Sequence, residues 1–126
     1  MRIVITGATS GLGAALACRL VREGATVFPV ARRKERLEKM VRENRSQGGP
    51  MHAHVGDVCA EPGSPRSMAR VAIEISRRYG PADVVVANAG YGVSGAFETL
   101  SLADYRRQFE TNVFGVLKTA MAFLPQ

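Results

Sequence analysis

The chain has 126 residues, 46% apolar and 22% charged, which suits one globular domain with a single core and excludes two domains or a membrane span of roughly 18 apolar residues. Its net charge of +6 is local, because seven basic residues face three acidic ones between Arg32 and Arg45, and no aromatic residues interleave with them, so we expect no nucleic-acid partner. Cys18 and Cys59 are too few for a disulfide framework and lack metal-ligand spacing, so we expect reduced, buried thiols, no metal and a cytoplasmic protein.

The first predicted unit is a strand, a glycine-rich turn and a helix. Residues 3–6 form a short apolar, β-branched run, and the first two residues lead directly into it, so we expect no leader segment. Leu12, Leu16 and Leu20 share one helical face. This spacing predicts a buried stripe on a helix that ends at Gly24.

The second unit pairs a strand over residues 25–30 with a helix over residues 33–45. Leu37 and Met40 lie at helical spacing, which predicts an apolar stripe opposite a solvated basic face. Pro29 does not suit the strand, because proline has no N–H to donate to a ladder. We therefore expect either an irregular strand or an unpaired amide side at this position.

The third unit is predicted to contain a strand over residues 52–58 and a helix that begins at Ser64, with Pro65 at its first helical position. Gly80 ends this helix. Its predicted buried face consists of apolar residues at helical spacing, namely Met68, Val71, Ala72, Ile75 and Tyr79.

The fourth unit begins with a strand over residues 83–87 that is apolar on both faces, as in a central parallel strand. After a loop over residues 88–100, Ser101 is predicted to cap the last helix, with Asp104 in a capping-box-like position. The apolar side of that helix is predicted to contain Tyr105, Phe109, Val113, Val116, Ala120 and Phe123. Four such units with right-handed crossovers predict an α/β fold, a doubly wound parallel sheet of Rossmann-like type with helices on both faces.

A glycine-rich loop between the first strand and the first helix is the first chemical signal. Gly7 can make the tight turn off the strand, Gly11 lets the backbone approach a pyrophosphate, and Gly13 lets the helix pack on the sheet. The helix N-terminus attracts the phosphate charge. A tight turn without a ligand is the alternative, and the absence of a Lys-Ser/Thr pair disfavours P-loop chemistry.

The spacing of these glycines resembles the cofactor loop of the short-chain dehydrogenase/reductase family, and three further motifs match in order. They are Gly56-Asp57-Val58, Asn88-Ala89-Gly90 and Thr111-Asn112-Val113. The resemblance covers residues 1–126 and implies one NAD(P)-binding Rossmann-like domain, truncated at its C-terminus after the fourth unit.

The resemblance also implies a role for each motif. The cofactor-binding residues would be Gly7, Thr9, Ser10, Gly11, Leu12, Gly13, Asp57, Val58, Asn88, Ala89 and Gly90. Of these, Asp57 and Val58 would lie beside the adenine, and the run from Asn88 would back the ribose and brace the sheet. Asn112 would position a water and a lysine in the catalytic proton relay. The alternatives are a loop cap at Asp57, a turn former at Asn88, and a mid-helix residue bonding its own backbone at Asn112.

The end of the second predicted strand indicates which cofactor is preferred. Sites that prefer NAD carry a carboxylate for the ribose 2′-hydroxyl about 20 residues past the glycines. Ala31 occupies that position here, and Arg32 and Arg33 follow it. A guanidinium can bind a 2′-phosphate with two hydrogen bonds, whereas a carboxylate would repel it. We therefore expect NADP rather than NAD, although both arginines also suit a merely solvated helix.

The resemblance is incomplete at the catalytic residues, because the family uses a serine and a Tyr-x3-Lys pair. Tyr79, Tyr91 and Tyr105 are not followed by lysine four residues later. We therefore expect the N-terminal, cofactor-binding portion of an NADP-dependent oxidoreductase for a small-molecule carbonyl or alcohol, inactive by itself. The alternative is a nucleotide-binding module with no chemistry of its own.

Association with a second copy is also predicted. The resemblance implies the strand order 3-2-1-4-5, in which the fourth strand is interior. Ending the chain after the last helix would then leave the valines of that strand, Val84, Val85 and Val86, on an open edge, and such edges recruit partners. The apolar side of the last helix is wide for an element that faces solvent. We therefore expect a homo-oligomer.

Overall fold

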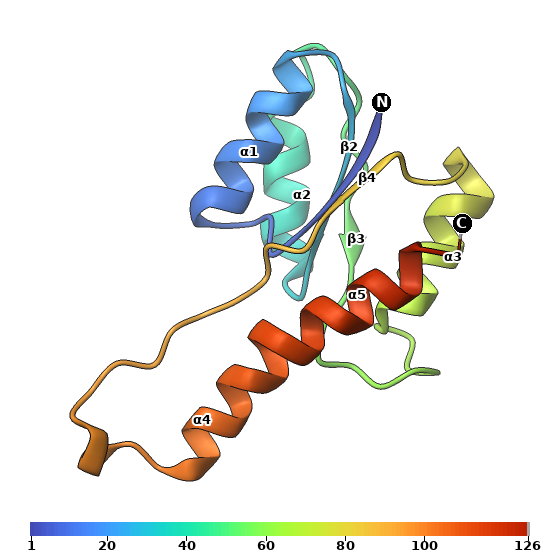
Figure 1. Ribbon diagram of the computed structural model, residues 1–126. Coiled ribbons are helices and arrows are strands. Elements are labelled where there is room, and N and C mark those ends of the chain that lie inside the picture. Colours follow the sequence, from blue (N-terminus) through green and yellow to red (C-terminus); the bar gives the residue numbers. More distant parts are fainter. Residues whose placement is uncertain (126) are drawn as a thin grey trace.

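The computed structural model describes residues 1–125 and contains a parallel sheet in the order β3-β2-β1-β4 (Figure 1). The strands are β1 (Arg2–Thr6), β2 (Thr26–Ala31), β3 (His54–Val55) and β4 (Val84–Val86). Ile5 of β1 stands opposite Pro29 in β2 and Val86 in β4. Within the described residues β4 is an edge strand, and the predicted doubly wound parallel fold is confirmed.

Helices cover both faces of this sheet. They are α1 (Gly11–Arg22) and α2 (Lys34–Glu43) on one face, and α3 (Met68–Tyr79) and α5 (Gly115–Phe123) on the other (Figure 1). Alternate side chains of β1 point to opposite faces, so Ile3 and Ile5 pack with α1, whereas Val4 packs with α3. One central strand therefore contributes to two hydrophobic cores. Among residues 1–125, no helix combines the length and apolarity needed to cross a bilayer.

Pro29 is accommodated because the ladder between β2 and β3 is interrupted beside it. Val27, two residues earlier, donates its N–H to the carbonyl of Pro50 on the β3 side. Successive residues of a strand alternate in direction, so the nitrogen of Pro29 points to the same side as that of Val27. Proline has no hydrogen on this nitrogen to donate. Pairing resumes only at Val30, opposite His54. The unpaired amide side was one of the two predicted outcomes.

The buried face of α1 differs from the predicted leucine stripe. Gly13, Ala17 and Val21 are buried, whereas Leu12 is 84% exposed and Leu16 is 37% exposed. The small residues Gly13 and Ala17 let the helix axis lie close to the sheet. Close packing of the helix against the sheet therefore determines which face of α1 is buried. The larger leucines each precede one of the buried residues by one position, so they lie nearer the solvent.

The strand of the third unit is shorter than predicted, and its helix begins later in the sequence. Its strand is reduced to His54–Val55, and α3 begins at Met68 with Ser67, not Ser64, as its N-cap. The Ser67 hydroxyl accepts a hydrogen bond from the Arg70 N–H at 3.4 Å. Ser64 instead accepts from the N–H two residues later, within a turn. The predicted face of α3 is confirmed at its buried positions, Met68, Val71, Ala72 and Ile75.

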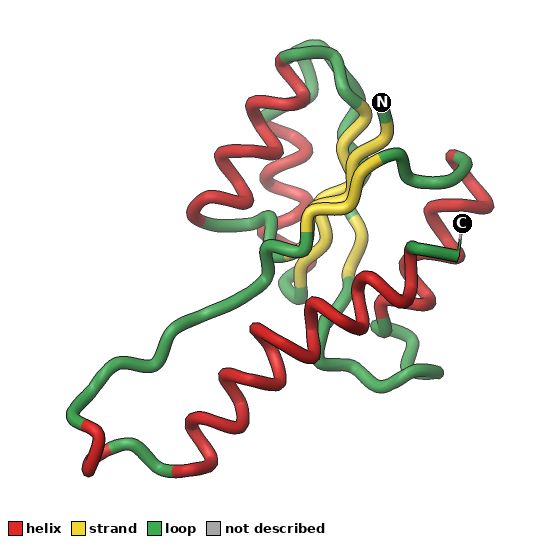
Figure 2. Tube along the Cα trace, viewed as in Figure 1, coloured by secondary structure: helices red, strands yellow, loops and turns green. Residues whose placement is uncertain are grey.

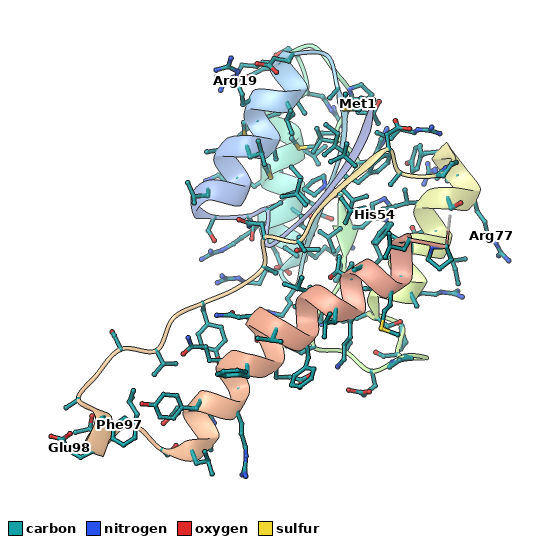
Figure 3. All side chains as sticks on the ribbon, viewed as in Figure 1. Met1, Arg19, His54, Arg77, Phe97 and Glu98 are labelled. Atoms are coloured by element: carbon teal, nitrogen blue, oxygen red, sulfur yellow. The ribbon has the colours of Figure 1, made fainter. Side chains whose placement is uncertain are left out.

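The last helix is one continuous rod with an unpredicted distortion at its centre (Figure 2). It consists of α4 (Leu102–Phe109), a π-helical segment η2 (Glu110–Phe114) and α5. The predicted capping box at Ser101 and Asp104 is confirmed. A loop with a short turn, η1 (Phe97–Thr99), precedes the rod, and Figure 3 shows Phe97 and Glu98 at its outlying tip.

The rod buries only part of the predicted apolar side. Gly115, Thr119 and Phe123 are buried, and Phe123 belongs to the core beside α3. Phe109 and Val113, predicted on the same apolar side as Phe123, are exposed. The π-helical segment changes the angular relation of residues before and after it, which turns Phe109 away from the face of Phe123. It does not account for Val116, which follows the segment and is exposed as well.

Two histidines on or beside β3 make stability depend on pH. His54 is buried, and its Nε2 has no hydrogen-bond partner among residues 1–125. Burial lowers the pKa of His52 and that of His54 below the ordinary histidine value. Arg78 lowers both further, and Glu74 partly offsets the shift at His54. Because the unfolded histidines titrate near about 6.5, the unfolded chain binds more protons as the pH falls below that value.

We therefore expect the melting temperature to fall by several degrees between about pH 7.5 and about pH 5.5. The change should be smaller in His54→Leu, measured by thermal denaturation under the same buffers. A melting temperature that rises on acidification would show that these histidines gain, rather than lose, charge on folding.

Candidate functional site

A cleft of about 430 Å³ lies at the carboxyl ends of the strands, where open parallel sheets bind ligands. It receives residues that follow each of the four strands, such as Gly7, Arg32, Asp57 and Asn88. The residues predicted from sequence that line it are Gly7, Thr9, Ser10, Gly11, Leu12, Arg32, Arg33, Asp57, Val58, Asn88, Ala89 and Gly90. The other predicted site residues, Gly13 and Asn112, lie behind this lining.

The turn from β1 into α1 requires glycine at two positions. Gly7 and Gly11 have φ values of 65° and 54°, in the left-handed region that other residues rarely adopt. A Cβ atom on Gly7 would lie 2.8 Å from the Cα of Ala89. The turn therefore brings its backbone directly against the loop that follows β4.

The N-terminus of α1 directly follows this turn and presents backbone N–H donors that the helix itself does not satisfy. Ser10 is the N-cap residue, but its hydroxyl makes no capping hydrogen bond, and the first turn contains no acidic side chain. The N–H groups of the first turn have no partner within the helix, and the helix dipole places partial positive charge there. Such a terminus is suited to a phosphate group.

Asn88 joins the loops after β1 and β4. Its Nδ2 donates hydrogen bonds to the carbonyls of Thr6 and Gly7, at 3.0 and 3.4 Å, and the Ala89 N–H donates to Thr6 Oγ1 at 3.0 Å. Gly13 of α1 packs directly against this amide, and a Cβ there would collide with Asn88 Nδ2 and lie 2.7 Å from the Gly7 carbonyl oxygen. These contacts connect the loops after β1 and β4 to each other and to α1 at the floor of the cleft.

Asp57 and Val58 form a second wall. Asp57 Oδ1 accepts the Cys59 N–H at 2.9 Å, and the Asp57 N–H donates to the Arg66 carbonyl at 2.8 Å. Asp57 thus caps its own loop and also lines the cleft. Val58 is buried, and Gly115 of α5 packs against it.

Arg32 and Arg33 give the end of the cleft beside β2 its positive charge. Both are exposed, and within residues 1–125 neither makes an ion pair. By contrast, Lys34 and Lys39 on the same basic helix pair with glutamates one turn away. Ala31 contributes no carboxylate at this end. The guanidinium groups are therefore available to an anion.

Asn112 lies in the π-helical segment and holds Tyr91 in place. Its Oδ1 accepts the Tyr91 N–H at 3.0 Å, and its Nδ2 donates to the Tyr91 carbonyl at 2.8 Å. Tyr91 lines the cleft, whereas Asn112 does not. The amide does not bond its own helix backbone, so that alternative is wrong; its neighbour Thr111 does so, donating to the Arg107 carbonyl.

The cleft also contains seven residues that were not among the predicted site residues, namely Thr6, Val30, Ala31, Gly56, Cys59, Tyr91 and Thr111. The Cys59 Sγ and Thr111 Oγ1 atoms lie 3.2 Å apart, although the residues are 52 positions apart in sequence. Both Cys59 and Cys18 are free and only half-buried, so the predicted burial of the thiols is wrong. The available signal was adjacency, because Thr111 directly precedes Asn112 and Cys59 directly follows Val58.

Comparisons with known proteins agree with this geometry. A family model described as short chain dehydrogenase matches residues 1–126. A putative ketoacyl reductase of a granaticin polyketide synthase from Streptomyces violaceoruber is 43% identical over 101 residues, which are 80% of this chain and 35% of that protein. A putative ketoacyl reductase from Streptomyces coelicolor is 39% identical over 123 residues, which are 96% of this chain and 45% of that protein.

Solved structures give the same result. An alcohol dehydrogenase from the archaeon Thermococcus sibiricus, complexed with 5-hydroxy-NADP, superposes with a TM-score of 0.89 at 38% identity, covering 98% of this chain and 52% of that one. An actinorhodin polyketide ketoreductase with NADPH has a TM-score of 0.88 at 35% identity, and the match covers 98% of this chain and 46% of that one. The chain spans half or less of the length of the curated relatives described above.

Proposed function

The chain belongs to the short-chain dehydrogenase family, and from this premise we propose that it is the cofactor-binding portion of an NADP-dependent oxidoreductase for a carbonyl or alcohol. Residues 1–126 would form one NAD(P)-binding domain that the rest of a longer protein completes. The observation that carries the proposal is the cleft, which is lined both by residues at the N-terminus of α1 and by Arg32 and Arg33.

The donor set of the cleft fits a cofactor with three phosphate groups. The N-terminus of α1, beside Ser10, would bind the pyrophosphate, and Arg32 and Arg33 would bind the 2′-phosphate of the adenosine ribose. Asp57 and Val58 would flank the adenine. Asn88, with the two residues after it, would back the second ribose. When bound, NADPH supplies the hydride.

Three further features favour NADP over NAD. No carboxylate stands at Ala31 to receive a 2′-hydroxyl, and none would repel a 2′-phosphate. Neither Arg32 nor Arg33 is neutralised by an ion pair within the part of the chain that the structure describes. The two similar structures described above hold an NADP derivative and NADPH.

Asn112 is proposed to act on the reaction indirectly, because it fixes Tyr91 beside the cleft. The part of its amide that does not bond Tyr91 would be available for a further hydrogen bond in the proton relay. The substrate itself would be a small carbonyl or alcohol. The proposal places the protein in the cytoplasm, where Cys18 and Cys59 would stay reduced.

A nucleotide-binding module without chemistry is the second candidate, because residues 1–126 contain no Tyr-x3-Lys pair. We expect this chain to bind NADPH without oxidising it in the presence of ketones, since general acid–base catalysis contributes about 10²- to 10⁴-fold and its donor is missing. NADPH absorbance with a panel of ketones measures this. Turnover that is lost in Tyr91→Phe would contradict the expectation and assign the missing acid to Tyr91.

Self-association is proposed as well. The edge strand β4 and an exposed apolar surface on the rod both lack cover within residues 1–125, and the surface consists of Phe109, Val113, Phe114, Leu117 and Met121. Edges and apolar patches of this kind pair with a second copy. We expect sedimentation velocity at micromolar concentration to give a dimer or larger species. A monomer with a cooperative thermal transition would contradict this.

A further inference from the structure

Lys118 of α5 makes three polar contacts with a single ammonium group. Its Nζ donates to Glu110 Oε1 at 2.8 Å, to Glu61 Oε1 at 2.9 Å and to the Cys59 carbonyl oxygen at 3.2 Å. An ammonium has three donors, so these contacts use all of them. The side chain is only 23% exposed, and the two glutamates raise the pKa of Lys118 to about 12.

These contacts join two parts of the chain that are distant in sequence. Cys59 and Glu61 lie in the loop that follows β3, directly after Asp57 and Val58, whereas Glu110 begins the π-helical segment. Lys118 therefore connects the Asp57–Val58 wall of the cleft to the helical rod on the far side of that wall.

Two further contacts lie at the same junction. Cys59 Sγ and Thr111 Oγ1 are 3.2 Å apart, and a Cβ atom on Gly115 would lie 2.8 Å from Val58 Cγ2. The rod therefore packs against this wall at several points. Lys118 supplies the charged contact among them.

Beyond the end of the sheet, the rod contributes to holding this wall together with the Asp57 N–H bond to Arg66 and the burial of Val58 in the core beside α3. β3 ends at Val55, and the last hydrogen bond from this segment to β2 runs from the Gly56 N–H to the Ala31 carbonyl at 3.0 Å. Beyond that point the position of Asp57 is fixed by its own loop and by the rod. Removing the ammonium would also leave Glu61 and Glu110 directed at the same point without a cation between them, and like charges repel.

We propose that Lys118 is a positioning residue for the adenosine end of the cofactor: through the Cys59 carbonyl it holds the Asp57–Val58 wall at the distance from the glycine loop that the nucleotide requires. The inference rests on the proposed function, because that function assigns the adenosine part of NADPH to this wall. Lys118 touches neither cofactor nor substrate in this role.

The test compares Lys118→Met and Lys118→Arg with a matched control, Lys39→Met. Lys39 also pairs with a glutamate, Glu43, but on the exposed face of α2, away from the cleft. The probes are NADPH, 2′,5′-ADP as its adenosine part, and nicotinamide mononucleotide as its other part, each titrated by calorimetry. Hydrogen exchange at the β1 amides verifies that each variant is folded.

We expect Lys118→Met to weaken both NADPH and 2′,5′-ADP by about tenfold, the effect of one lost hydrogen bond to a charged group, and to leave nicotinamide mononucleotide unchanged. Lys118→Arg should recover most of the loss, because it restores the cation, and Lys39→Met should bind as the parent chain does. If Lys118→Met fails to fold, Lys118→Gln replaces it with the same expected pattern.

Three results would overturn the inference. Wild-type affinity for 2′,5′-ADP in a folded Lys118→Met shows that the wall does not need Lys118. Equal weakening of all three probes shows a general structural role. Failure of the parent chain to bind either NADPH or 2′,5′-ADP refutes the proposed function, and the inference with it. This result is distinguishable from the first two because it is seen in the chain without any substitution.

Discussion

Replacing Gly13 by valine should lower the melting temperature by roughly 10 °C and abolish measurable NADPH binding. Gly13 is buried where α1 meets the sheet, and any Cβ there meets Asn88 Nδ2 and lies 2.7 Å from the backbone oxygen of Gly7. The Asn88 amide can move only by breaking its bonds to Thr6 and Gly7. Overpacking of this kind costs about 1–3 kcal/mol, occasionally more, and here it also opens the phosphate-binding turn.

Gly92→Val is the matched control for this substitution. Gly92 lies in the exposed loop after β4, and no atom lies within 4 Å of a Cβ placed there. Thermal denaturation and calorimetry of both variants separate a local collision from a general effect of adding valine. A Gly13→Val chain with the parent melting temperature would show that α1 does not lie as close to Asn88 as described above.

The double substitution Ala31→Asp with Arg32→Ala should reverse the cofactor preference. We expect NADPH affinity to fall about 100-fold, because charge-assisted hydrogen bonds worth about 1.5–3 kcal/mol are lost and the new carboxylate repels the 2′-phosphate. NADH affinity should rise, since the carboxylate can accept a bond from the 2′-hydroxyl.

Calorimetric titration of both cofactors measures this ratio. Arg36→Ala is the control, because Arg36 is an exposed residue of the same basic helix and does not line the cleft. An unchanged ratio in the double variant would mean that Arg32 and Arg33 only solvate their helix.

The parts of the fold that could be predicted from sequence are those whose pattern is local. The apolar face of α3 and the capping box of α4 follow from spacing over a few residues, and both were predicted correctly. The face of α1 was not, because hydrophobic size favoured Leu12 and Leu16, whereas packing distance favoured Gly13 and Ala17. The π-helical segment has no periodic signal, since it inserts one residue into an otherwise regular helix.

In the candidate site, too, the residues that could be predicted lie in local sequence patterns, whereas those that could not are placed by tertiary packing. The glycine loop, Asn88 and Asp57 follow strand ends, so their place at one edge of a parallel sheet follows from topology. Thr111 and Lys118 lie on a helix whose path over the sheet is set by tertiary packing against α3. Their contacts with Cys59 join residues 52 and 59 positions apart, which no local pattern in one sequence encodes.

Backbone amide shifts during a titration with NADPH test the proposed cleft most directly. We expect saturable shifts at the glycine loop from Gly7 to Gly13, at Arg32 and Arg33, and at Asp57 and Val58, with weaker binding of NADH at the same residues. The absence of saturable shifts, or shifts confined to the separate hollow around His52 and Arg78, would contradict the assignment of this cleft to the cofactor.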